Sequence, residues 1–109
     1  MSERIRYMRL IVFFDLPVAT SLQRKNSAQF VRFLKKSGYL MMQESVYTKL
    51  AVNNKVVNGL IGRLRENRPP EGLVQVLKIT EQQYASIENI IGGQTEREEL
   101  DDLSDLVVL

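Results

Sequence analysis

One stretch decides the fold of this chain: Tyr7-Met8-Arg9-Leu10-Ile11-Val12-Phe13-Phe14-Asp15-Leu16-Pro17. It is rich in β-branched and aromatic residues, and its later part is apolar at consecutive positions. That pattern is typical of a central strand that is covered on one face and crowded on the other. Proline cannot continue a strand ladder, so we expect the strand to end before Pro17.

A helix is predicted between Thr20 and Gly38. Thr20 and Gln23 form a capping box, in which the hydroxyl and the amide each bond a free backbone N–H group. Gly38 suits the position just past the end of a helix. Apolar residues at helical spacing predict the face that packs on the core: Leu22, Phe30, Phe33 and Leu34.

Residues 39–52 read as extended structure, broken near residues 43–45 into two strands or one bulged strand. Met41 and Met42 are predicted to fill gaps in the core. Asn53 or Asn54 then caps a second helix, which Pro69-Pro70 ends. Its apolar residues are the most regular amphipathic set in the chain: Val56, Val57, Leu60, Ile61 and Leu64.

Another strand is predicted over residues 73–79. A second capping box, Thr80 with Gln83, leads into a short helical stretch that Gly92-Gly93 ends. One side of that stretch is predicted to be apolar: Tyr84, Ile87 and Ile91.

The order strand, helix, strand, strand, helix, strand predicts an α+β, ferredoxin-like βαββαβ domain over residues 1–93. Residues 94–102 form an acidic connector, and residues 103–109 predict an extra C-terminal strand. We expect that strand, through Leu103, Leu106, Val107, Val108 and Leu109, to pair with a second protomer and build a homodimer. The alternative is that it covers an edge of its own sheet.

The net charge of +2 hides an uneven distribution. Residues 1–68 carry thirteen Lys and Arg against four acidic residues, whereas residues 69–109 carry two against nine. Such a division indicates a body that binds a polyanion and an acidic C-terminal segment. Composition does not separate DNA from RNA or a membrane surface, although no apolar run is long enough to cross a bilayer. A reducing, cytoplasmic setting is expected.

The 109 residues contain no Cys and no His. This excludes disulfides, thiol nucleophiles, Cys or His metal centres and a histidine general base. Any chemistry must therefore use carboxylates, hydroxyls, backbone groups and cations.

Asp15 is the main candidate for such chemistry, because it ends the first predicted strand beside a turn. A carboxylate there is well placed to hold Mg²⁺ against a phosphate, but one carboxylate does not make a magnesium site. Two copies of Asp15 brought together by a dimer would make a better one. The alternative is that Asp15 accepts backbone hydrogen bonds in the Asp-x-Pro turn. Glu44 is a second, weaker candidate, and Ser45, Tyr47 and Thr48 could donate to phosphates.

Candidate nucleic-acid-binding residues fall into three clusters: Arg4, Arg6 and Arg9; Arg24 and Lys25; and Arg63, Arg65 and Arg68. The second cluster lies near a helix N-terminus, whose free N–H groups attract phosphate. The third lies where a helix dipole also favours cations, which is the alternative explanation for its position. Contacts of these kinds would be to phosphate, with little reading of sequence.

Three stretches of the sequence resemble the small CRISPR-associated adaptation protein, which is the non-integrase partner in spacer acquisition. The three stretches also agree with that family in their order and spacing. They are residues 6–17, residues 38–50 and Ile61-Gly62-Arg63-Leu64. The likeness runs from about Arg6 to Tyr84, with residues 103–109 in the place of the family's terminal strand. It is closest to members from type II-A systems.

The resemblance implies a ferredoxin-like homodimer whose terminal strands add to the partner's sheet. It also implies a complex in which this dimer bridges two dimers of the CRISPR integrase and supports a prespacer duplex of DNA, with other type II-A adaptation proteins as further partners. The family has also been assigned metal-dependent nuclease activity through an aspartate that corresponds to Asp15. Two function classes therefore stand: a structural DNA-binding adaptor, which we favour, and a Mg²⁺-dependent endonuclease acting on RNA or DNA.

Overall fold

The computed structural model describes residues 6–92. In chain order it contains β1 (Met8–Asp15), α1 (Ser21–Lys36), β2 (Leu40–Gln43), β3 (Val46–Ala51), α2 (Asn54–Glu66), β4 (Leu73–Thr80) and α3 (Glu81–Ala85). The predicted βαββαβ order is confirmed, and the fold is ferredoxin-like. The acidic connector and the C-terminal strand that the sequence predicts lie outside the described residues.

The sheet has the strand order β2-β3-β1-β4, and each neighbouring pair is antiparallel. β1 is therefore a central strand, as its apolar sequence predicts. Val12, for example, lies opposite Tyr47 of β3 on one side and opposite Val76 of β4 on the other. β2 and β4 are the two outer strands of the sheet. Within the described part of the chain, each has a neighbouring strand on one side only.

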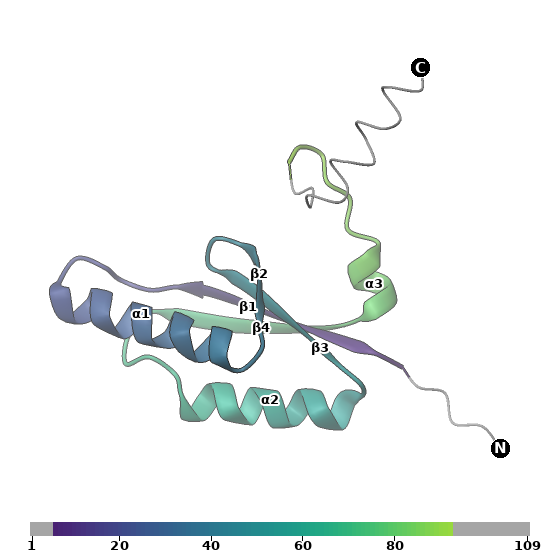
Figure 1. Cartoon of the computed structure of the whole chain (residues 1–109), viewed down its shortest axis with the longest axis horizontal. Helices are drawn as coiled ribbons and strands as arrows, with labels where there is room; N and C mark the ends of the chain where they lie inside the picture. Colours follow the sequence, from purple (N-terminus) through teal and green to yellow (C-terminus); the bar gives the residue numbers. More distant parts are fainter. Residues whose placement is uncertain (1–5, 93–109) are drawn as a thin grey trace.

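Both long helices lie on the same side of the sheet, where they are adjacent to each other (Figure 1). Leu10 and Val12 of β1 are fully buried beneath them. The helices contribute the rest of this core through Phe30 and Leu34 of α1 and Val57 and Leu64 of α2. We call this side of the sheet the helix face, and the opposite side the open face.

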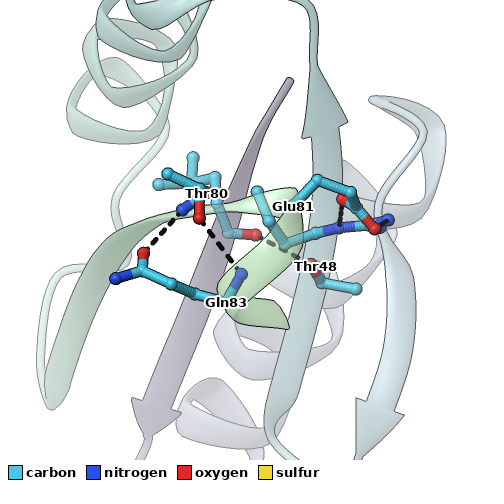
Figure 2. Close-up of polar contacts among 6 residues, drawn as sticks. Thr48, Thr80, Glu81 and Gln83 are labelled. Atoms are coloured by element: carbon cyan, nitrogen blue, oxygen red, sulfur yellow. Dashed lines mark hydrogen bonds and ion pairs between the residues drawn. The ribbon is translucent and has the colours of Figure 1, made fainter. Parts of the chain in front are cut away.

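The three helix starts follow from local side-chain chemistry. Thr20 and Gln23 form the predicted capping box of α1, in which the Gln23 N–H group donates to Thr20 Oγ1 over 3.0 Å. The second predicted box, of Thr80 and Gln83, begins α3 (Figure 2). Asn53 caps α2 by accepting from the Val56 N–H group. Because each cap satisfies a backbone donor that would otherwise be free, the sequence fixes where the helices begin.

Several positions expected on buried apolar faces are wrong, Val56 (40% exposed) and Ile87 (47% exposed) among them. Leu22 is 64% exposed, since the first turn of α1 extends beyond the core, and Met41 is 63% exposed on the short outer strand β2. The third helix ends at Ala85 instead of reaching Gly92, which leaves Ile91 94% exposed. The predicted break near residues 43–45 is confirmed, and it divides this stretch into two strands: a turn at Glu44-Ser45 separates β2 from β3. A β-bulge lies within β2, between Met41 and Gln43.

Gly72 sets the start of β4 beside the end of β1. Its φ is +98°, a left-handed conformation that side-chain-bearing residues rarely adopt. A Cβ atom added there would lie 2.7 Å from the Asp15 carbonyl oxygen and 2.8 Å from Leu16 Cδ2. Glycine is therefore required at this position for both conformational and steric reasons.

We predict that Gly72→Ala lowers the free energy of unfolding by roughly 1–3 kcal/mol, because the new methyl group meets backbone in a strained conformation. Gly59→Ala is the matched control, since that helical position has nothing within 4 Å and gains helix propensity. Urea unfolding of both variants measures the difference. Equal stability of the two would contradict the close approach.

Candidate functional site

Asp15 lies at the exposed end of β1, opposite Leu73 of β4. Strand alternation places its side chain on the open face, with Phe13, Ile11 and Arg9. The turn between β2 and β3, which carries Glu44, reaches the same end of the sheet, because the Phe14 N–H group donates to the Ser45 carbonyl over 3.0 Å. The two candidate carboxylates thus share one end of the sheet.

A single chain provides little for a metal ion at this end. Among residues 6–92, no group of three or more His, Cys, Asp or Glu side chains is arranged to hold one. Mg²⁺ takes six oxygen ligands, so Asp15 alone would leave most of them to water, substrate or a second copy. The roles of Asp15 and Mg²⁺ remain predictions.

The hydroxyl candidates in β3 are used within the protein. Thr48 is buried, and its Oγ1 donates to the Leu10 carbonyl oxygen over 3.0 Å (Figure 2). Tyr47 is buried on the helix face and stacks on Phe14, with the ring centroids 5.8 Å apart. Thr48 is therefore not placed to donate to a phosphate at the surface, and the Tyr47 ring is part of the core on the helix face.

Arg9 makes the ion pair that ties α3 to the sheet. Its Nε and Nη2 atoms donate to the two carboxylate oxygens of Glu81 over 2.8 and 2.7 Å. The guanidinium also lies over the Tyr84 ring, 4.2 Å from the centroid. Arg9 is only 15% exposed at its side chain. This arrangement accounts for Arg9 as a structural residue, so we leave it out of the nucleic-acid surface proposed below.

The other predicted cations lie at the surface. Arg6, Arg24 and Lys25 are exposed, and Arg24 Nη1 donates to the Val18 and Ala19 carbonyls over 3.1 Å each. Arg24 thereby also stabilises the loop that leads from β1 into α1. Its guanidinium keeps further donors for a ligand.

The third basic cluster divides between two grooves. Arg63 lines a groove between α1 and α2, whereas Arg65 borders a second groove of about 390 Å³ beside β4. Arg68 borders both, and its Nη1 donates to the Arg65 carbonyl oxygen. The structure thus brings Arg63 and Arg68 together but turns Arg65 away from Arg63.

Sequence reasoning missed two members of the first groove, Arg32 and Lys36 of α1. Their spacing of four residues places them on one face of a helix, which the sequence does show. That this face borders α2 depends on the packing of the two helices. No sequence signal identified that contact.

Comparison with known proteins settles the family. The model of the family described as "CRISPR associated protein Cas2" matches residues 8–87. The chain belongs to the Cas2 family. This confirms the resemblance that the three sequence stretches indicate, and the match spans every strand and helix of the described fold.

Curated relatives agree with this assignment. The chain is 49% identical to a protein of Treponema denticola over 102 residues, which covers 94% of this chain and all of that protein. It is 40% identical over 102 residues to one of Lacticaseibacillus rhamnosus, covering 94% and 99%, and 44% identical over 78 residues to one of Streptococcus mutans, covering 72% of each. Each of the three relatives is named CRISPR-associated endoribonuclease Cas2. Within residues 6–92, no helix is both long and apolar enough to cross a membrane.

We predict that Arg9→Ala lowers the free energy of unfolding by about 1–3 kcal/mol, because it removes the bidentate salt bridge with Glu81. The same variant should leave the affinity for duplex DNA unchanged, since Arg9 is engaged by Glu81. Arg6→Ala, which removes an exposed cation of the same cluster, is the control for stability. Thermal unfolding and fluorescence anisotropy measure the two effects, and weaker duplex binding by a folded Arg9→Ala variant would make Arg9 a phosphate contact after all.

Proposed function

We propose that this chain is a structural, DNA-binding subunit of the CRISPR spacer-acquisition complex. In this role a homodimer bridges dimers of the CRISPR integrase and supports the prespacer duplex. Membership of the Cas2 family supports the CRISPR setting. The observation that carries the structural role is the open face of the sheet, which is apolar and bears few candidate catalytic groups.

Exposed apolar side chains cross the open face from strand to strand. They are Leu40 of β2 at 69%, Leu50 of β3 at 46%, Phe13 of β1 at 38%, and Leu73 and Leu77 of β4 at 53% and 47%. Soluble monomers rarely leave such a contiguous apolar surface in water. Packing against the same surface of a second copy would bury these side chains in a two-fold, self-complementary interface.

The free edge of β4 supports the expected role of the C-terminal strand. β4 is eight residues long and outermost in the sheet, so it has unpaired backbone groups along one side. An apolar groove runs beside it, lined in part by Ile61, Leu64 and Val76. A strand with the sequence of residues 103–109 would satisfy that edge and place alternate apolar side chains in this groove.

The charge of the chain supports a DNA partner. Arg24 and Lys25 lie at the N-terminal end of α1, where free N–H groups add to their attraction for phosphate. Neutralising phosphates with such cations releases counterions and gives affinity without sequence specificity. That kind of binding suits a subunit that supports duplexes of many sequences.

A second candidate function is a Mg²⁺-dependent endonuclease acting through Asp15. Two observations favour it: the relatives are named endoribonucleases, and Asp15 lies on the open face where a dimer would bring two copies toward each other. With no His in the chain, water on the metal or a carboxylate would have to serve as the base.

We predict that Leu77→Glu converts the dimer to a monomer, because burying a carboxylate in an apolar interface is costly. The fold should survive, since Leu77 is half exposed in a single chain. Leu22→Glu, at an exposed position on α1, should keep the dimer. Light scattering after size-exclusion chromatography gives the masses, and a wild-type monomer would end the homodimer proposal.

We also predict that Asp15→Ala leaves duplex affinity and spacer acquisition within about twofold of wild type, because phosphate binding uses the cations of α1. Anisotropy and acquisition in cells that carry the complete system measure these properties. Loss of acquisition by a folded, dimeric Asp15→Ala variant would refute the purely structural role. Mg²⁺-dependent cleavage of labelled RNA or DNA that disappears in this variant would establish the endonuclease.

A further inference from the structure

The groove between α1 and α2 has a volume of about 810 Å³ and lies on the helix face of the molecule. Its lining carries positive charge from both helices, through Arg32 and Lys36 of α1 and Arg63 of α2. Arg68 adds a guanidinium at the end of α2, and Glu66 is the one acidic residue in the lining. The groove is therefore basic, with cations contributed from both of the helices that border it.

Three of these cations have no competing partner. Within residues 6–92, no hydrogen bond or ion pair engages the side chains of Arg32, Lys36 or Arg63. Lys49 differs, because its ammonium donates to the Ser37 carbonyl at the end of α1 and serves the helix terminus. The binding capacity of the groove thus comes from the two helices and not from the sheet beneath them.

The lining of the groove also contains aromatic and amide side chains. Phe33 is partly exposed in the groove and stacks on the buried Phe30, with ring centroids 6.4 Å apart and planes at 26°. This contact holds the Phe33 ring in place from below. The amides of Asn26, Gln29 and Asn67 add donors and acceptors to the same lining.

We propose that this groove binds single-stranded nucleic acid, with phosphates on the cations and a base on Phe33. A basic channel that contains an aromatic side chain is the common arrangement of single-strand sites. A duplex would present phosphates to the cations but would keep its bases stacked inside the double helix. The Phe33 ring would then be desolvated without stacking on a base. The inference rests on the proposed nucleic-acid-binding function and adds a second site to it.

The location makes this site separate from Asp15 and from the dimer surface. Both of those lie on the open face, whereas the groove lies on the opposite side of the sheet. A dimer formed through the open faces therefore leaves one groove exposed on each protomer. Each duplex-binding dimer would carry two outward sites for single-stranded segments.

The first test compares two double variants with the same loss of charge on the same helices. Lys36→Ala with Arg63→Ala removes cations from the groove, whereas Lys35→Ala with Lys55→Ala removes exposed cations outside it. Anisotropy with a labelled oligo-dT at low salt should show at least tenfold weaker binding by the groove variant and at most a twofold change by the control. The slope of log affinity against log salt should fall by roughly 1.4 in the groove variant, since each single-strand phosphate contact contributes roughly 0.7.

A second test addresses the aromatic contact. Phe33→Leu should weaken oligo-dT binding about fivefold or more, the lower end of what loss of one base stack costs. Phe33→Trp should restore or exceed wild-type affinity, which a merely structural role of the ring would not produce. Circular dichroism confirms that each variant is folded before its affinity is compared.

The outcomes separate this inference from the proposed function. A duplex of matched sequence should lose affinity when Arg24 and Lys25 are both changed to Ala, and the groove variant should weaken duplex binding less than it weakens oligo-dT binding. If changing Arg24 and Lys25 weakens duplex binding while oligo-dT binding is insensitive to the groove variant, the groove site is wrong and the duplex-binding function stands. If neither nucleic acid binds to wild type, the proposed function itself falls. Displacement of oligo-dT from the groove by poly-glutamate at lower concentration than by unlabelled oligo-dT would make it a site for acidic peptides and overturn the assignment.

Discussion

The burial of β1 in the middle of the sheet is the constraint on which the rest of the structure depends. Leu10, Ile11 and Val12 are three consecutive residues, and each is no more than 4% exposed. Because successive side chains of a strand point to opposite faces, such a run is stable only if both faces are covered at this level. The two long helices cover Leu10 and Val12 on the helix face. Ile11 lies on the open face between Thr48 of β3 and Leu77 of β4, and it is 4% exposed there.

The two faces of the sheet consequently have different chemistry. The helix face is closed by its own core, so the outer surfaces of α1 and α2 are free to carry cations and to form the basic groove. The open face keeps apolar side chains of four strands at the surface, with Asp15 at one end. One small domain can therefore present a surface suited to a second copy on one side and a surface suited to a polyanion on the other.

The Arg9–Glu81 pair shows how a local cap and a distant contact combine. Thr80 and Gln83 begin α3, but five residues make too short a helix to be stable by itself. The two-bonded pair and the position of Arg9 over Tyr84 attach this turn to the central strand. Arg9, which the distribution of charge along the sequence made a candidate for binding nucleic acid, instead stabilises the fold through these contacts.

Helix starts, the order of strands and helices along the chain and the fold class were determined by the sequence itself, because caps such as Thr20 with Gln23 and apolar periodicity act over a few neighbouring residues. The position of Asp15 at the end of the first strand was predictable for the same reason, since a proline turn follows it. Only the tertiary structure decided which cations meet across α1 and α2, that Arg9 is engaged by Glu81, and that Met41 lies outside the core. Those outcomes depend on packing between segments that are far apart in the chain, and no local pattern carries that information.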